Sequence, residues 1–291
     1  MATSNHKSVA DSWENLVWFI NERHRIFVKR RAEFPSPWTT DKILQEAKFC
    51  NVYRQDDKVT RFEIEWLKQN FGFEKQLRGI LLLRHCNSIP AFQWLMGDVD
   101  QPPDKDMIGD AMICWKENFA DKGHEFTKKE YIERWVEFVD GKNRLDDLCD
   151  RLRYLRDGKV AYYLIRDFRD CMHKTKLPEP YNHYNQFWAY EVYTSLTYTK
   201  WFAPTENDFV FVGPGASPAL LKLYGNPARY DQVRYLVDVH KFLKENLKLE
   251  DARPWTLRNT EHCLCEWRKY FQIKEHSKPI RRSYSPPAWA R

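Results

Sequence analysis

Apolar residues recur along most of the chain at the three- and four-residue intervals of an amphipathic helix. Near the N-terminus, Trp13, Leu16, Val17 and Ile20 form one such stripe. The same period predicts helices over residues 41–54, 60–70, 127–139, 144–156, 185–198, 217–223, 230–247 and 256–270. The pattern therefore predicts an all-α fold.

The length of the chain and its proline positions predict how these helices are organised. A chain of 291 residues can form one large helical domain or two small ones. We expect a single helical domain over residues 1–275, with a glycine hairpin at 209–221. Residues 276–291 contain three prolines and scattered arginines, and we expect them to form a basic, extended tail.

Composition and charge narrow the class of protein. Hydrophobic residues make up 43% of the chain and charged residues 30%, as in globular proteins with a real core. A net charge of +6 and a pI of about 8.8 are compatible with a polyanionic partner but do not by themselves indicate one. The aromatic residues, 15% of the chain with 12 tryptophans, fill a core and also offer flat surfaces on which bases can stack.

Several common signals are missing from the sequence. The chain has no apolar run of about 18 residues and no signal-peptide core, and its seven scattered cysteines include no CxxC pair. These features predict a cytoplasmic protein with reduced thiols and no membrane segment, metal or other cofactor. The patterns GxxxxGK[ST], GxGxxG, HExxH and GxSxG are also missing, and no feature indicates an obligate protein partner.

A glycine hairpin at residues 212–216 is the sharpest local feature. Gly213 and Gly215 flank a proline, allow positive φ, and leave backbone N–H groups uncovered. A helix is predicted to begin at Ser217, so the amides of Gly213, Gly215, Ala216 and Ser217 suit a phosphate oxygen. Helix-hairpin-helix proteins hold the DNA backbone in this way without reading sequence. The alternative is an ordinary tight turn between helices.

An acidic residue follows the hairpin at a suggestive distance. Asp238 lies 23 residues after Gly215 (238 − 215), which resembles the arrangement in helix-hairpin-helix DNA glycosylases. There, a carboxylate stabilises positive charge on the sugar or orients a water as the glycosidic bond breaks. The iron–sulfur cysteines and the hairpin-adjacent lysine of some of those enzymes are absent. The alternative for Asp238 is a solvated charge on a helix.

A dense polar block lies nearer the N-terminus. On a helix, Asn51, Arg54 and Lys58 share one face, and Asp57 follows Arg54 by three residues. Asn can pair with a base edge, and Arg offers a fork of donors to phosphate or carbonyl oxygens. The alternative is a buried Arg–Asp pair that joins two helices. The residues of this block predicted to line a base pocket are Trp38, Asn51, Tyr53, Arg54 and Asp57.

The last predicted helix carries a third group of polar residues. Glu261, Cys265 and Arg268 share one of its faces, and the neighbouring pair Glu261 and His262 can perform acid–base work. We assign His262 to the predicted base pocket as well. The alternative for His262 is structural packing.

Five motifs occur in an order that resembles a known family. They are Glu22–Ile26, Pro37–Thr39, Phe49–Arg54, Gly213–Gly215 and Glu261–Glu266. Across residues 15–285, the chain resembles the helical domain of the 5-hydroxymethyluracil DNA kinases, in the α-glutamyl/putrescinyl-thymine pyrophosphorylase superfamily. Two departures are the ending Trp267–Tyr270, where the family has an acidic residue before Lys-Tyr, and the missing kinase P-loop domain.

The resemblance implies a fold related to helix-hairpin-helix DNA glycosylases and an enzyme that flips hypermodified pyrimidines out of phage DNA. Some members replace a phosphorylated 5-hydroxymethyl group with an amine, and others, including bacterial anti-phage proteins, remove the modified base. We expect a DNA glycosylase that excises a 5-substituted pyrimidine, with Asp238 or Glu261 as the catalytic acid. We expect Arg23, Arg25, Arg268 and the hairpin to hold the DNA backbone. The alternatives are a transferase acting on the phosphorylated base and a non-catalytic DNA-binding module.

Overall fold

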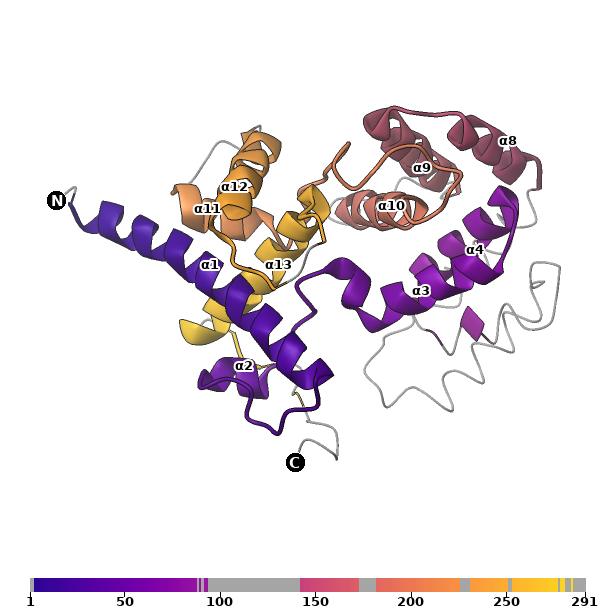
Figure 1. Cartoon of the computed structure of the whole chain (residues 1–291). Helices are drawn as coiled ribbons and strands as arrows, with labels where there is room; N and C mark the ends of the chain where they lie inside the picture. Colours follow the sequence, from indigo (N-terminus) through magenta and orange to yellow (C-terminus); the bar gives the residue numbers. More distant parts are fainter. Residues whose placement is uncertain are drawn as a thin grey trace. The chain divides into compact units, whose positions relative to one another are not determined.

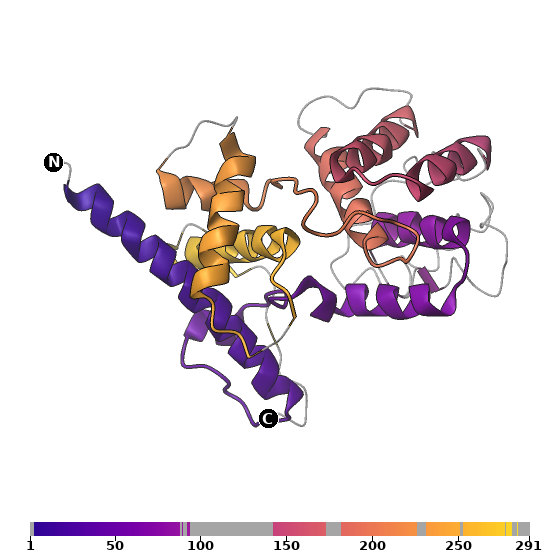
Figure 2. The same cartoon turned by 45° about the horizontal axis from the view of Figure 1, so that its top comes forward.

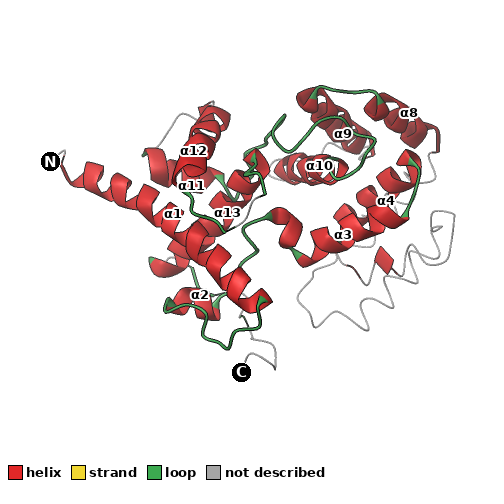
Figure 3. Cartoon of the chain, in the orientation of Figure 1, coloured by secondary structure: helices red, strands yellow, loops and turns green. Residues whose placement is uncertain are grey.

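A computed structural model describes residues 3–87, 89, 92–93, 142–172, 182–225, 231–250, 253–276, 278–280 and 284. Within these residues, the regular elements are helices, as Figure 3 shows, and the predicted all-α fold is confirmed. The predicted helix over 127–139 and most of the tail over 276–291 lie outside the described residues. No helix in the described part of the chain is long and apolar enough to cross a membrane.

The chain divides into two compact units. Unit 1 combines Met1–Asp57 with Val210–Arg291, and unit 2 is the intervening segment Lys58–Phe209. Each unit is described by itself below. The single domain over residues 1–275 stays a prediction.

Unit 1 is built around its last helix. It contains α1 (Thr3–Arg31), α2 (Lys42–Glu46), the 3-10 helix η1 (Arg54–Asp56), α11 (Ser217–Tyr224), α12 (Gln232–Asn246) and α13 (Leu257–Lys274). Helix α13 contacts all five of the others, and Figures 1 and 2 show it lying among α1, α11 and α12. This central helix therefore brings together segments from both ends of the sequence.

The start and the core face of α13 follow from its residues. The hydroxyl of Thr256 caps the helix by accepting a hydrogen bond from the Asn259 N–H at 3.2 Å. Leu264 and Trp267 are fully buried, and the Trp267 indole N–H donates to Asn15 Oδ1 on α1 at 2.9 Å. The N-terminal stripe predicted from the sequence supplies the other side of this core: Leu16 and Ile20 are fully buried.

The predicted helix over residues 41–54 is wrong beyond its first turn. Asp41 does cap a helix, because its carboxylate accepts the Leu44 N–H at 2.9 Å, but α2 ends at Glu46. The segment after it is irregular up to η1. Its backbone amides are bound by side chains instead of helical carbonyls: Cys50 N–H donates to Glu266, and Asn51 N–H donates to Asp57. Asn51, Arg54 and Lys58 therefore do not share a helix face.

Unit 2 contains α3 (Lys58–Gln69), α4 (Phe73–Cys86), α8 (Lys142–Arg153), α9 (Gly158–Met172) and α10 (Asn182–Leu196). Helix α10 packs against α4 and α9, and α8 also contacts both of these helices. Leu77, Ile80 and Ile165 are fully buried in this core. A charged residue joins them: Arg84 on α4 is paired with Glu63 and lies 3.5 Å from Glu191.

Candidate functional site

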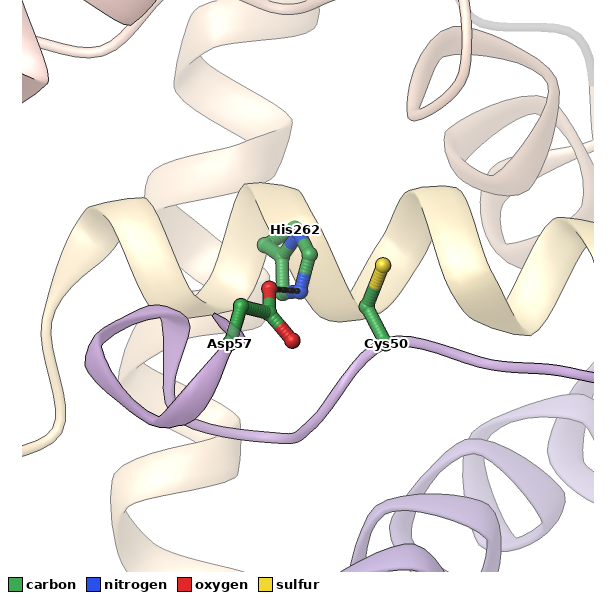
Figure 4. Close-up of side chains that lie close together, drawn as sticks. All are labelled: Cys50, Asp57 and His262. Atoms are coloured by element: carbon green, nitrogen blue, oxygen red, sulfur yellow. Dashed lines mark ion pairs between the residues drawn. The ribbon is translucent and has the colours of Figure 1, made fainter. Parts of the chain in front are cut away.

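The candidate site is a polar cluster in which the irregular segment before α3 lies against α13. We define the cluster by its six members: Cys50, Asn51, Arg54, Asp57, His262 and Glu266. Figure 4 shows Cys50 and Asp57, on the segment, facing His262 on α13. Four of the six residues, Asn51, Arg54, Asp57 and His262, were predicted from the sequence to line one pocket. Hydrogen bonds and close approaches of their charged groups join these four residues in the structure.

Asp57 occupies the centre of the cluster. One of its carboxylate oxygens, Oδ1, accepts the Asn51 N–H at 2.9 Å and so closes the loop between them. The other oxygen, Oδ2, lies 3.2 Å from an Arg54 guanidinium nitrogen and 3.5 Å from Nε2 of His262. The Asp57 side chain is 14% exposed. Asp57 is thus a fixed carboxylate with one oxygen turned toward a cation and an imidazole.

His262 is a buried imidazole that favours its neutral form. Its Nε2 atom lies 3.1 Å from the carbonyl oxygen of Asn51. Burial lowers the pKa of His262; Asp57 opposes this effect, whereas Arg54 and Arg258 add to it. A neutral imidazole has one donor and one acceptor nitrogen. Nε2 faces the oxygens of the Asn51 carbonyl and the Asp57 carboxylate, which only accept, so Nε2 is the donor.

Cys50 adds a thiol that sequence reasoning did not single out. Its backbone N–H donates to Glu266 at 2.9 Å, and its carbonyl oxygen accepts from Arg23 at 3.0 Å. Burial raises the pKa of the Cys50 thiol, and the negative charges of Glu266 and Asp57 raise it further. The backbone of Cys50 is therefore anchored on both sides while its thiol is kept protonated.

Glu266 links the cluster to a surface cation. Lys269 donates to both of its carboxylate oxygens, at 2.8 and 2.9 Å. Burial by itself raises the pKa of Glu266, but Lys269 and His262 outweigh it and bring the pKa below its ordinary value. Glu266 consequently contributes a permanent negative charge next to Cys50.

Residues outside the cluster hold its backbone and side chains in place through further hydrogen bonds. The Asn51 side chain donates to the Asp56 carbonyl at 2.9 Å and accepts from Arg30 at 3.2 Å. Asp56 in turn holds Arg253 through two hydrogen bonds of 2.7 and 3.0 Å. Rigid support of this kind is what a binding or catalytic group needs to keep its geometry.

Two aromatic residues predicted for the base pocket are buried. Tyr53 packs under the Arg253 guanidinium, which lies 4.1 Å from the centre of its ring, and against Trp255 at 5.9 Å. The indole N–H of Trp38 donates to the Phe34 carbonyl at 2.7 Å. Tyr53 therefore packs directly before Arg54 of the cluster, whereas the contacts of Trp38 include Phe34 and the ring of Tyr284, whose centre lies 6.0 Å away.

The hairpin is a tight turn in which the backbone amides and the glycines have other roles than those predicted from the sequence. The N–H groups of Ala216 and Ser217 both donate to the Gly213 carbonyl at 3.1 Å, so these two amides are used inside the turn. Among the described glycines, positive φ occurs at Gly72 and Gly225. Gly215 is needed for close approach instead, because a Cβ atom there would overlap Sγ of Cys265 on α13.

The arginines predicted to hold the DNA backbone have contrasting environments. Arg23 is buried and donates to the carbonyls of Phe49 and Cys50, and burial lowers its pKa. Arg25 is 59% exposed and pairs with Glu22. Arg268 donates to the Pro214 carbonyl at 3.3 Å and thereby ties the hairpin to α13.

The two predicted catalytic acids also lie in opposite environments. Asp238 on α12 has a side chain that is 47% exposed, with Lys241 4.0 Å away. Glu261 on α13 is 3% exposed and paired with Arg258, which is equally buried. Solvent reaches one of these acids, and an arginine holds the other.

Within the described residues, the cluster and the fold together define an all-helical protein in which a buried imidazole lies beside a partly exposed carboxylate and a partly exposed thiol. The chain matches the family described as "5-hmdU DNA kinase, helical domain" over residues 10–278. The chain belongs to this family, as the order of its motifs predicted. No curated protein and no solved structure matches it. The family is associated with enzymes that modify DNA, and its name refers to a 5-substituted pyrimidine nucleoside.

Proposed function

We propose that the protein is a DNA N-glycosylase that flips a 5-substituted pyrimidine out of the duplex and excises it. In this reaction, the bond between the base nitrogen and C1′ breaks with its electrons going to the base. The oxygen of a water molecule forms the new bond to C1′, and the water's proton neutralises the departing base. Family membership supports the choice of substrate.

The single observation that carries the proposal is the convergence of Asn51, Arg54, Asp57 and His262 in one cluster. A guanidinium, a carboxylate and a neutral imidazole supply the donors and acceptors that the edge of a pyrimidine requires. Their side chains come from two segments far apart in the sequence. A structural ion pair needs no imidazole beside it, and this mixture of groups therefore favours a ligand-binding role.

Asp57 is the carboxylate that we propose for the chemistry. Glu261 is neutralised by Arg258 within the core, and Asp238 stands on an exposed helix surface beside Lys241. Asp57 has one oxygen free of the backbone and faces both Arg54 and His262. Such a carboxylate can stabilise the positive charge that develops on the sugar, or can orient water.

We further propose a helix-hairpin-helix-like grip on the DNA backbone. Arg25 and Arg268 supply positive charge, and the hairpin at Gly213 and Gly215 is joined to α13 through Cys265. Phosphate contacts of this type position the duplex without reading its sequence. The flipped base would then be read by the cluster.

The test uses duplex DNA in which one strand carries 5-hydroxymethyluracil, or a glycosylated or phosphorylated form of it. The glycosylase reaction yields a free modified base, detected by mass spectrometry, and an abasic site, detected by strand cleavage in alkali. Asp57→Asn, Glu261→Gln and Asp238→Asn rank the three acids. Asp147→Asn, on the exposed surface of α8, is the matched control.

The family name also supports an alternative reaction, in which the protein is a transferase. The family is named for DNA kinases, whose product carries a phosphate on the 5-hydroxymethyl group. A transferase that replaces this phosphate with an amine leaves the DNA strand intact and changes the mass of the base. That outcome replaces the glycosylase proposal, and binding without any product on any of these substrates indicates a DNA-binding module.

A further inference from the structure

Three side chains of the cluster offer one metal-binding atom each. They are the Cys50 sulfur, a carboxylate oxygen of Asp57 and a ring nitrogen of His262, and all three atoms lie within 4.8 Å of one another. Figure 4 shows Asp57 facing His262, with Cys50 beside them on the same irregular segment as Asp57. We propose that Cys50, Asp57 and His262 form a binding site for a zinc ion.

The spacing of these atoms is close to that of a zinc site. Zinc bonds to sulfur, nitrogen and oxygen are roughly 2.0–2.3 Å long, so ligand atoms around a tetrahedral ion lie about 3.3–3.7 Å apart. Oδ2 of Asp57 and Nε2 of His262 are already 3.5 Å apart. Because the three atoms lie within 4.8 Å of one another, the sulfur has to approach by up to about 1.5 Å, which requires a rotation of the Cys50 side chain.

Neighbouring groups hold the ligands in place, but two of the binding atoms are already engaged: Nε2 of His262 with the Asn51 carbonyl and Oδ2 of Asp57 with Arg54, and both contacts have to give way to an ion. The Asn51 N–H holds Oδ1 of Asp57, which leaves Oδ2 directed into the cluster. Glu266 and Arg23 hold the backbone of Cys50 on its two sides and do not engage its sulfur. Metal ligands are characteristically oriented by outer partners of this kind.

Some charges around the site favour the binding of a cation and others oppose it. Asp57 and Glu266 attract a cation, whereas Arg54 lies 3.2 Å from the same Asp57 oxygen that a metal ion would take. Arg54 must move aside when the ion binds. Its side chain is 15% exposed and starts from a short 3-10 helix, so it has a route toward solvent. Removal of Arg54 is therefore expected to tighten binding.

The ligand set favours zinc over the hard cations. A thiolate and an imidazole suit Zn²⁺, whereas Mg²⁺ and Ca²⁺ prefer oxygen ligands throughout. Three protein ligands leave a fourth position open, as in catalytic zinc sites. Sequence spacing conceals the site, because His262 lies 205 residues beyond Asp57 (262 − 57). This inference competes with the direct role proposed for Asp57, whose Oδ2 the ion would occupy, and ion binding can be tested without DNA.

The experiment titrates the chelator-treated full-length protein with Zn²⁺ against a chromophoric competitor, and with Co²⁺ followed by optical absorption. We expect one ion per chain, and a Co²⁺ spectrum that contains a sulfur-to-metal charge-transfer band and the intense ligand-field bands of tetrahedral cobalt. Cys50→Ser should abolish the charge-transfer band. It should also weaken zinc binding by about 100-fold or more. Loss of a residue that only orients a metal ligand can already cost up to about 100-fold in affinity, and loss of the ligand itself should cost at least as much.

Two further variants keep the proposal open to refutation. Cys265→Ser removes a thiol that lies on α13, like His262, but is not one of the three ligands, and this variant should bind zinc as the wild type does. Arg54→Gln should bind more tightly, a result that a misfolded protein cannot give. Wild-type protein that binds no ion more tightly than the Cys50→Ser variant does, or a Cys50→Ser variant that keeps the charge-transfer band, overturns the site. Cleavage of modified DNA by a protein that binds no zinc refutes this inference alone and leaves the proposed function standing.

Discussion

Each unit of the protein contains a buried network of charges, and the two networks differ in ways that separate structure from function. In unit 2, Arg84 is 2% exposed and bonds to Glu63, Glu191 and the Ser195 hydroxyl at 2.6 Å. These residues come from regular helices. In unit 1, Asp57 on an irregular segment meets His262 on α13.

The chemistry of the two networks differs as well. The unit 2 network contains a guanidinium, two carboxylates and a hydroxyl, in which Arg84 offsets the charge of the buried Glu63. The unit 1 cluster adds an imidazole and a thiol whose pKa values are both shifted by burial. Groups of this kind are typical of sites that bind or react, and the segment that carries Cys50 and Asp57 is irregular. The comparison therefore predicts a stability role for one network and a binding role for the other.

The largest stability effect is expected in unit 2. Arg84→Ala leaves Glu63 buried without its cation, and should lower the free energy of unfolding by about 3–5 kcal/mol. Urea denaturation followed by circular dichroism measures this loss. Lys68→Gln, which breaks the exposed pair with Glu65, is the control and should change stability by less than about 1 kcal/mol. A similar small loss for Arg84→Ala would remove the structural role of the network.

The close contact between the hairpin and α13 predicts the next effect. Gly215→Ala places a Cβ against Cys265, and this overpacking should cost about 1–3 kcal/mol. In a Cys265→Ala background the same substitution should cost less, because the sulfur is gone. A double-mutant cycle measures the coupling. Equal costs in both backgrounds would mean that Gly215 is required for another reason.

The two neighbouring arginines of α1 offer a matched pair for DNA binding. Arg25→Gln removes an exposed charge, and should weaken binding to any DNA sequence and reduce the slope of log K against log salt by about 1. Arg23→Gln should instead lower stability, because the Arg23 side chain is buried and holds Phe49 and Cys50. Fluorescence anisotropy across a salt series distinguishes them, and an unchanged slope for Arg25→Gln counts against the proposed grip.

The last effect concerns His240 on α12 and is confined to acidic pH. Burial, followed by Lys244, lowers the pKa of His240 to about 4 from an ordinary value of 6.5. Between these two pH values the unfolded chain binds a proton that the folded protein does not. Stability is therefore fully present above about pH 6.5 and falls as the pH drops toward 4. His240→Asn should flatten this decline in melting temperature, and an identical decline in the variant would contradict the assignment.

Most of the helices could be predicted from apolar spacing. The N-terminal stripe and the helices that became α3, α8, α10, α11, α12 and α13 were predicted, whereas α4 and α9 were not. Helix α4 did not emerge, since its centre, residues 80–83, is a continuous apolar run without a polar face. The predicted helix after Asp41 failed because Glu266, more than 200 residues away, binds the amide of Cys50.

The site was predicted in part for comparable reasons. Asn51, Arg54, Asp57 and His262 stood in two motifs with suggestive chemistry, and their recorded contacts bring them together. Cys50 and Glu266 belonged to the same motifs, but their chemistry depends on neighbours from the other end of the chain. Arg23 was assigned to the DNA backbone because a buried arginine and an exposed one look alike in a sequence.

The most direct test of the central claim compares one residue from each network on modified DNA. Asp57→Asn and Glu191→Gln each neutralise a partly buried carboxylate, in unit 1 and unit 2 respectively. The measurement is the single-turnover rate of release of 5-hydroxymethyluracil from duplex DNA, using variants verified as folded. We predict that Glu191→Gln releases the base at the wild-type rate and that Asp57→Asn is slower by at least about 100-fold. Equal rates for the two variants would contradict the assignment of the chemistry to the unit 1 cluster.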